Sequence, residues 1–357
     1  MDWSIASILT LDGLTNGAVY ALLALATVLL FAITRVIFIA QGEFVAYGAL
    51  TVAVLQSGNP VGSVWERLGD LPGTVWLLLA AALITASVES LRDLRAGFGV
   101  RAVLLAAGKT LLWPVLMFVL ARLGSPRAWP LWAQSVFALA VVTPLGPLVY
   151  RLAYDKVADA SVLVLLIVSV GVHFALTGLG LVFFGAEGFR NPSFWEARFQ
   201  LGTLSVSGQT LIVFAVTLLL MAALYAFFER TLEGKALRAT AVQRLGARLM
   251  GISTARAGRL SFGLAAFIGA LCGVLIGATT TVYYDSGFLF GLKGFVAAVF
   301  GGLASYPVAA LGALCVGVLE SFSSFWASAF KEVIVFTLII PALLWRSFLH
   351  GQHDEEA

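Results

Sequence analysis

One apolar run near the start of the chain decides the fold class. Residues 11–33 read LDGLTNGAVYALLALATVLLFAI, and no charged residue stands between Asp12 and Arg35. As an α-helix, a run of this length crosses the ~30 Å hydrocarbon core of a bilayer. Comparable runs recur towards the far end of the chain, and charged residues are only 11% of the 357, roughly half the share typical of a soluble domain. The sequence therefore predicts an all-α, polytopic transmembrane helical bundle that forms a single domain over residues 1–357.

Polar breaks divide the chain into about nine to eleven apolar segments. Two of these are short and bordered by glycine: residues 42–57 follow Gln41, and residues 288–303 contain Gly301 and Gly302 at their end. Short segments interrupted by glycine are typical of broken or re-entrant helices that line a cavity. The expected segments are 11–33, 42–57, 73–91, 101–123, 130–150, 158–184, 209–229, 260–281, 288–303, 307–325 and 329–346.

The distribution of Lys and Arg predicts how the chain is threaded. With residue 1 outside, fourteen of these residues fall on the cytoplasmic side and seven fall outside, while Lys109 lies within a span. Because basic residues favour the cytoplasmic side, we expect the N-terminus outside and the C-terminus inside. Residues 1–10 lack the basic region and the cleavage site of a signal peptide, so the first helix is expected to be retained.

The longest cytoplasmic stretch between spans, residues 230–259, holds seven basic residues and one acidic residue. Leu237, Ala241, Leu245 and Leu249 recur every four residues, which predicts a short amphipathic helix. Such a basic helix can lie on anionic lipid, or it can seat in a groove of an ATPase as a coupling helix. Its apolar face lacks the aromatic residues common in lipid-bound helices, but the residue pattern alone leaves both interpretations open.

Polar side chains within the apolar segments are candidates either for function or for packing between helices. Glu43 is a pathway candidate, because a charge in or beside a span is costly; alternatively, it stabilises the start of the second helix through the helix dipole. Lys293 and Glu320 could form a pair, although separate structural anchoring is the simpler interpretation. Asn16 and His173 are expected to hydrogen-bond to neighbouring helices.

The sequence does not predict an enzyme, a metal site or a cofactor site. The chain has no Gly-x-x-x-x-Gly-Lys-Ser/Thr motif, so it does not hold ATP in the P-loop manner. Lys109, Thr110 and His173 form no catalytic set of the kinds known for intramembrane enzymes. Energy for any transport must therefore come from another subunit or from an ion gradient.

Four stretches, in the same order along the chain, resemble the branched-chain amino acid ABC permeases, the membrane subunits of high-affinity leucine/isoleucine/valine and urea importers. The stretches are 14–22 (LTNGAVYAL), 40–44 (AQGEF), 234–239 (GKALRA) with 249–252 (LMGI), and 291–302 (GLKGFVAAVFGG) followed by Glu320-Ser321. Any one stretch is weak evidence, but four in order are specific. The resemblance covers about residues 11–57 and 145–346.

The resemblance implies a permease subunit of a bacterial ABC importer in the inner membrane, which passes a branched-chain amino acid or a related small organic solute. The implied partners are a homologous second permease, two cytoplasmic ATPase subunits, a periplasmic solute-binding protein and membrane lipid, with no nucleic acid. Segment 230–259 then becomes the ATPase-coupling element, through Lys235, Arg238, Ala239, Gln243, Leu245, Leu249, Gly251 and Ile252. The implied translocation pathway includes Asn16, Gly17, Gln41, Gly42, Glu43, Tyr47, Lys293, Gly301, Gly302 and Glu320.

Some positions depart from the family pattern. Phe38 and Gln41 stand where the family usually has Asn and His, and Ala304 and Val308 replace glycines. Residues 58–130 are longer than the resemblance implies, with about two additional spans around 73–123. The alternative function is an ion-coupled secondary transporter, which would need coupling carboxylates near the middle of the membrane, where this chain has very few.

Overall fold

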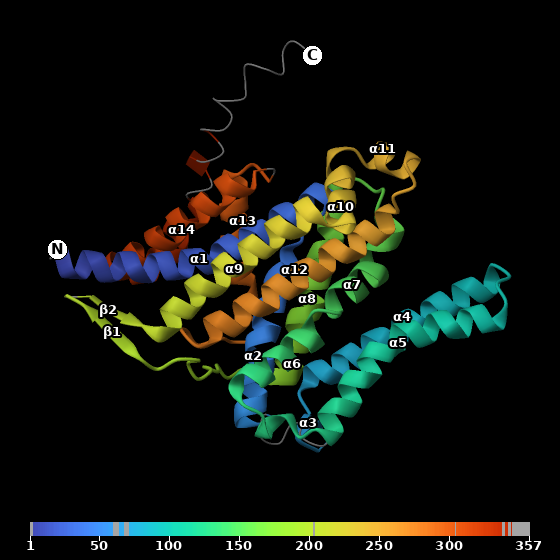
Figure 1. Ribbon diagram of the computed structural model, residues 1–357, viewed down its shortest axis with the longest axis horizontal. Helices are drawn as coiled ribbons and strands as arrows, with labels where there is room; N and C mark the ends of the chain where they lie inside the picture. The colour runs from blue at the N-terminus through green and yellow to red at the C-terminus, as the bar shows by residue number, and fades with distance from the viewer. Residues whose placement is uncertain are drawn as a thin grey trace, which may run out of the picture.

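The computed structural model describes residues 3–59, 64–67, 71–202, 204–303, 305–337, 340, 341 and 344. In these residues, eight helical segments are long and apolar enough to cross a membrane. They are α1 (Trp3–Thr34), α4 (Gly73–Arg95), α5 (Val100–Leu123), the composite segment Leu131–Val157, α8 (Val162–Phe184), α9 (Gly208–Arg230), α12 (Thr254–Gly277) and α14 (Tyr306–Trp326). The predicted all-α polytopic bundle is confirmed (Figure 1).

The core of the bundle lies along α1, which packs against α14, α12 and α13. Three glycines let α1 and α14 touch backbone to backbone. A Cβ added to Gly317 would lie 2.3 Å from the carbonyl oxygen of Gly13 and 2.4 Å from the amide nitrogen of Gly17. No side chain fits at such a distance, so the crossing requires glycine.

The two segments predicted to be broken helices are short in the structure. The 3₁₀ turn η1 (Ile39–Gly42) leads into α2 (Glu43–Ser57), and α13 runs over Ser286–Phe300. Both helices have 15 residues, fewer than the ~20 that cross a bilayer. They meet at Gly42, where a Cβ would lie 1.8 Å from the carbonyl oxygen of Gly287. Two half-length helices are thus held together by direct backbone contact.

The composite segment Leu131–Val157 consists of four short elements: α6 (Leu131–Val142), α7 (Leu145–Val149), the π-helical turn η3 (Tyr150–Tyr154) and η4 (Asp155–Val157). Pro144 stands between α6 and α7, where a proline cannot donate the backbone hydrogen bond of a continuous helix.

Helices α4 and α5 form a hairpin that extends away from the rest of the bundle (Figure 1). They occupy the region 73–123 in which two additional spans are predicted; the short elements α3 (Val64–Arg67) and η2 (Pro126–Ala128) flank them. Arg151 connects the hairpin to the bundle, because its Nε lies 2.7 Å from Glu89 Oε1 on α4 and its Nη2 lies 3.0 Å from Thr110 Oγ1 on α5.

The single amphipathic helix predicted within 230–259 is wrong. The chain forms two helices, α10 (Leu232–Val242) and α11 (Arg244–Leu249). They are separated at Gln243, whose backbone is extended (φ −153°, ψ 104°). As a result Leu237 is buried, whereas Leu245 and Leu249 are 65% and 79% exposed. The four-residue spacing could not show this break, since glutamine is an ordinary helix former.

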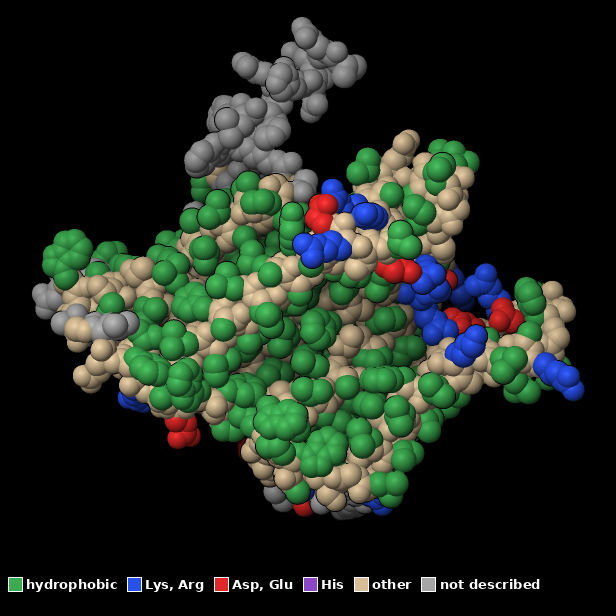
Figure 2. All heavy atoms as spheres, in the orientation of Figure 1, with side chains coloured by type: hydrophobic (Ala, Val, Ile, Leu, Met, Phe, Trp, Pro, Cys, Tyr) green, Lys and Arg blue, Asp and Glu red, His purple; other side chains and the backbone are tan. Residues whose placement is uncertain are grey.

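The two ends of the bundle carry different elements and different numbers of basic side chains. At one end lies a two-stranded antiparallel sheet, β1 (Arg198–Leu201) and β2 (Leu204–Ser207), near the first residues of α1, while α10 and α11 lie at the other end (Figure 1). Lys and Arg side chains gather around α10, α11 and the tip of the α4–α5 hairpin (Figure 2). After α14 come η5 (Ser328–Phe330) and α15 (Lys331–Thr337); most of the remaining predicted segment up to 346, like Ala304, lies outside the described residues.

Candidate functional site

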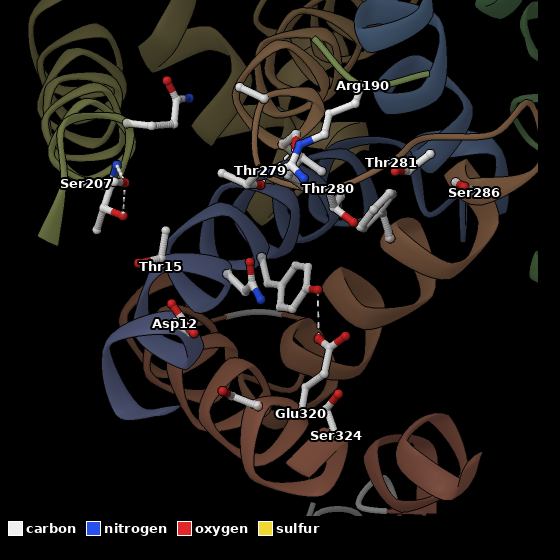
Figure 3. Close-up of a pocket in the computed structure, with 18 of the residues that line it drawn as sticks. Asp12, Thr15, Arg190, Ser207, Thr279, Thr280, Thr281, Ser286, Glu320 and Ser324 are labelled. Carbon is white, nitrogen blue, oxygen red and sulfur yellow. Dashed lines mark hydrogen bonds between the residues drawn. The ribbon is translucent and has the colours of Figure 1, made fainter. Parts of the chain in front are cut away.

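A large polar cavity opens at the end of the bundle that carries the β-hairpin. Its volume is about 1110 Å³, slightly above the ~300–1,000 Å³ typical of small-molecule sites. Its walls come from α1, the segment 190–198, the start of α9, residues 276–281 (the end of α12 and the turn after it), and helices α13, α14 and α15. Hydroxyl side chains are frequent among them: Thr15, Ser193, Ser207, Thr210, Thr279, Thr280, Thr281, Ser286, Ser321 and Ser324 (Figure 3).

A buried ionic cluster forms part of the cavity wall. The Lys293 ammonium is only 4% exposed and lies 2.6 Å from Glu320 Oε1 and 3.2 Å from Glu332 Oε1. The Tyr20 hydroxyl donates a hydrogen bond of 2.7 Å to Glu320 Oε2, and Lys293 Nζ lies 5.7 Å from the centre of the Tyr20 ring. A buried ammonium is tolerated when it is paired in this way, so three helices, α13, α14 and α15, are joined here by charge.

The cluster shows what sequence reasoning found and missed. The Lys293–Glu320 pair, left open by the sequence, is formed. Glu332 and Tyr20 were missed as its members. Tyr20 lies four residues after Asn16, on the same face of α1, and this spacing is the signal that could have found it. Nothing in the sequence pattern places Glu332 beside Lys293.

The hydroxyl of Tyr20 gives a direct test of the cluster. Tyr20→Phe should lower the free energy of unfolding by about 1.5–3 kcal/mol, the usual contribution of a hydrogen bond to a charged group. Tyr283→Phe is the matched control, because Tyr283 lines the same cavity but is 45% exposed. Denaturant titration of the purified protein in detergent measures both; equal effects of the two substitutions would contradict the prediction.

Glu43 and His173 form a second buried contact, outside the cavity lining. Glu43 Oε1 lies 2.9 Å from His173 Nδ1, and the Glu43 side chain is completely buried. Within the described residues neither Glu43 oxygen has a hydrogen-bond partner of good geometry, so the close approach of the His173 ring is the polar contact made by this carboxyl group. The contact brings α2 and α8 together, whereas the side-chain hydrogen bond of His173 is made within α8, between its Nδ1 and Thr177 Oγ1 (3.4 Å).

The predicted pathway residues fall into two groups. Asn16, Lys293 and Glu320 line the cavity. The others are Gly17, Gln41, Gly42, Glu43, Tyr47, Gly301 and Gly302, and they lie outside its lining. Gln41 Nε2 donates to the carbonyl oxygen of Ala265 (3.0 Å), and the Tyr47 hydroxyl donates to that of Leu176 (2.7 Å).

The glycines of the second group sit at close contacts or turns. Gly17 faces the α14 backbone at Leu314, and a Cβ on Gly301 would lie 2.5 Å from the carbonyl oxygen of Ser305. Gly302 has a φ of +62°, a conformation that favours glycine. A pathway role for this second group stays a prediction.

The predicted coupling residues form a surface at the opposite end. Lys235, Arg238 and Ala239 are exposed on α10, Gln243 between the helices, Leu245 and Leu249 on α11, and Gly251 after it, while Ile252 is half-buried. Arg238 is paired with Glu229 at the end of α9. Val242 and Met250 are more than four-fifths exposed. Together with the coupling residues they make up a mixed basic and apolar patch, which we term the α10–α11 surface.

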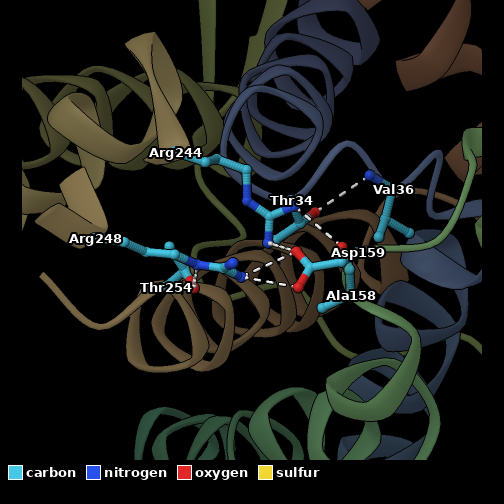
Figure 4. A network of polar contacts seen from close by, with 7 residues as sticks. All are labelled: Thr34, Val36, Ala158, Asp159, Arg244, Arg248 and Thr254. Atoms are coloured by element: carbon cyan, nitrogen blue, oxygen red, sulfur yellow. Dashed lines mark hydrogen bonds and ion pairs between the residues drawn. The ribbon is translucent and has the colours of Figure 1, made fainter. Parts of the chain in front are cut away.

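Helix α11 is held in place by two arginines. Arg248 Nη2 lies 2.9 and 3.1 Å from the two carboxylate oxygens of Asp159, and its Nε donates to Thr254 Oγ1 (3.0 Å). Arg244 Nη1 donates to the carbonyl oxygen of Ala158 (3.0 Å; Figure 4). These contacts connect α11 both to the turn before α8 and to the first residue of α12.

A bundle of membrane-length helices with a polar cavity at one end and an exposed, anchored surface at the other defines a multi-pass membrane transport protein. Residues 96–343 match the family described as the branched-chain amino acid transport system permease component. The chain belongs to this family of permease subunits.

Named relatives agree with this assignment. The chain is 32% identical over 238 residues to the high-affinity branched-chain amino acid transport system permease protein LivH of Escherichia coli K12 and to LivH of Salmonella typhimurium; each alignment covers 64% of this chain and 77% of the relative. It is 31% identical over 226 residues to BraD of Pseudomonas aeruginosa, which covers 61% of this chain and 74% of that protein. The solved structure of PsaBC from Streptococcus pneumoniae in complex with Fab aligns at 12% identity over 94% of this chain and 90% of the matched chain, with a TM-score of 0.36.

Proposed function

We propose that this chain forms the translocation path for a branched-chain amino acid, or a closely related small organic solute, in an importer of the bacterial inner membrane. ATP hydrolysis takes place in two separate cytoplasmic subunits, a homologous second permease completes the path, and a periplasmic binding protein delivers the solute. The N-terminus lies outside and the C-terminus inside, so the polar cavity faces the periplasm and the α10–α11 surface faces the cytoplasm.

The anchoring of α11 is the observation that carries this proposal. Leu245 and Leu249 on α11 and Met250 directly after it are 65–82% exposed. Exposed apolar side chains at a water-facing end favour a protein partner. The contacts of Arg244 and Arg248 with residues 158–159 connect that surface to α8 and α12. A partner that pushes on α11 therefore moves two spanning helices directly.

The double substitution Leu245→Glu and Leu249→Glu tests the docking role. We expect the ATPase subunits to be lost from the purified complex and solute uptake to fall at least tenfold, because two carboxylates would be placed in an apolar contact. The fold should be retained, since both side chains are exposed. Leu123→Glu is the matched control: Leu123 is also 79% exposed but ends α5, far from α11. Retention of the ATPases by the double variant would refute the docking role.

Energy coupling distinguishes the importer from the ion-coupled alternative. In cells that take up radiolabelled leucine through this system, dissipating the membrane potential should leave uptake intact, while depleting ATP should stop it. The reverse result would establish an ion-coupled transporter instead.

A further inference from the structure

The α4–α5 hairpin exposes apolar side chains right up to the turn between its two helices. In the most apolar 18 residues of α4 and of α5, only 33% and 17% of the residues are buried. Near the turn the exposed fractions of the hydrophobic side chains are 47–68%, at Leu91, Leu94, Phe98, Val100, Leu104 and Leu105. Exposed apolar surface of this extent on helices of spanning length is stable in hydrocarbon. The hairpin is therefore surrounded by lipid along most of its length.

The end of the hairpin carries a net positive charge. Residues 91–101 (LRDLRAGFGVR), which we term the hairpin tip, contain three arginines and one aspartate, a formal charge of +2: Arg92, Arg95, Arg101 and Asp93. All three arginines are exposed, and in the part of the chain that the structure describes none of their guanidinium groups forms a hydrogen bond or an ion pair. The neighbouring carboxylate of Glu89 is bound by Arg151. The positive charge of the tip is thus left without a partner in these residues.

The length of the helices places these arginines at the level of the lipid headgroups. Helix α4 has 23 residues and ends at Arg95, so it is ~34 Å long and slightly exceeds the ~30 Å hydrocarbon core. Arg101 is the second residue of α5 and lies at the same end of the hairpin. Only residues 96–99 separate the two helices, with a tight turn at Gly97 (φ +83°), so the tip does not extend far beyond the headgroup layer.

An acidic protein surface or anionic lipid headgroups could neutralise the tip, and the pattern of side chains favours lipid. Phe98 and Val100 are 61% and 63% exposed and stand between Arg95 and Arg101 in the sequence. Apolar and basic side chains mixed in this way suit the boundary of a bilayer, where the apolar groups enter the hydrocarbon and the charged groups stay in the headgroup layer. A guanidinium group there can bind a phosphate through two parallel hydrogen bonds.

We infer that the hairpin tip binds the headgroups of anionic phospholipids in preference to zwitterionic ones, through Arg92, Arg95 and Arg101. The inference goes beyond the proposed function and depends neither on its solute nor on its partner subunits. Its failure would therefore leave the proposed function unchanged.

The test measures the lipid composition at the tip itself. Ala96→Cys in a Cys315→Ser background provides one accessible thiol for a fluorophore, because Cys272 is completely buried. The labelled full-length chain is reconstituted in phosphatidylcholine vesicles with a small fraction of spin-labelled phosphatidylglycerol or of spin-labelled phosphatidylcholine. The quenching by each lipid gives the ratio of their local concentrations. This ratio should be at least about fivefold, the factor that one basic residue contributes near an anionic surface.

Two sets of substitutions at the same positions separate charge from shape. Replacing Arg92, Arg95 and Arg101 together by glutamine should lower the ratio to about one, because the attraction for the anionic headgroup is lost. The fold should be retained, since all three residues are exposed. Replacing the same three residues by lysine keeps the charge and should keep the preference.

Arg35→Gln combined with Arg230→Gln controls for location. Both residues are exposed, at the ends of α1 and α9, and this variant should keep the wild-type ratio. A wild-type ratio near one would overturn the inference, and so would a fivefold preference that the glutamine variant retains. Quenching by neither lipid would place the tip outside the headgroup layer and overturn the inference in favour of a protein contact.

Discussion

A Gly42→Leu variant is expected to fail to fold into a monodisperse protein. The added Cβ would lie 1.8 Å from the carbonyl oxygen of Gly287 and 2.8 Å from the amide nitrogen of Gly291. Both obstructing atoms belong to the backbone. Overpacking that a shift of side chains can relieve costs about 1–3 kcal/mol. Here α2 and α13 must separate, so the free energy of unfolding should fall by more than ~3 kcal/mol. Size-exclusion profiles and thermal unfolding in detergent would measure it.

Gly171→Ala is the matched control for this substitution. Gly171 lies in α8, and a Cβ there would meet no atom within 4 Å. Alanine should be neutral or should stabilise that helix by up to ~1 kcal/mol. If Gly42→Leu eluted and unfolded like the Gly171→Ala variant, the backbone contact between η1 and α13 would not exist as described.

Lys293→Met should be nearly as disruptive. It removes the ammonium group that Glu320 and Glu332 share and leaves two carboxylates facing each other in a buried site. Removing one member of a buried charge pair typically costs 3–5 kcal/mol. We expect a loss of about this size in the free energy of unfolding, measured by denaturant titration in detergent.

Two further variants test whether the loss of stability in Lys293→Met comes from the missing charge. Lys331→Met removes a side chain that is 40% exposed and lies 3.9 Å from Glu332, so it should cost less than ~1 kcal/mol. Lys293→Met combined with Glu320→Gln should recover part of the loss, because one of the uncompensated charges is gone. A double variant less stable than Lys293→Met would show that packing, not charge, is what Lys293 contributes.

The sequence predicts the fold of this chain well because membrane-spanning segments are decided by local composition. The apolar run at 11–33 and the glycine-bordered segment at 42–57 became α1 and the half-length α2. Bilayer thickness sets the length of a span, and the residues within each run are enough to recognise it. The break at Gln243 was not predictable in this way, because α11 is anchored through Arg248 to Asp159, and these two residues lie 89 positions apart in the chain.

The candidate site was predicted only in part, for a related reason. Lys293, Glu320 and Asn16 stand out because polar groups are rare within apolar segments. Glu332 and Arg190 do not stand out, since charged residues near the ends of spans are ordinary. Their significance comes from the cavity wall that they share with Lys293 or with Thr279, and that proximity exists only after the helices have packed.

The glycine contact between α1 and α14 also limits how this sequence can drift during evolution. Any missense change of the codons for residues 13, 17 or 317 adds at least a Cβ, which would come within 2.3–2.9 Å of the backbone of the facing helix. The obstructing atoms are main-chain atoms, and these are the same whatever amino acid occupies the facing position. No second-site substitution of a facing side chain can therefore make room, and a lineage that loses one of these glycines regains the contact only by reversion.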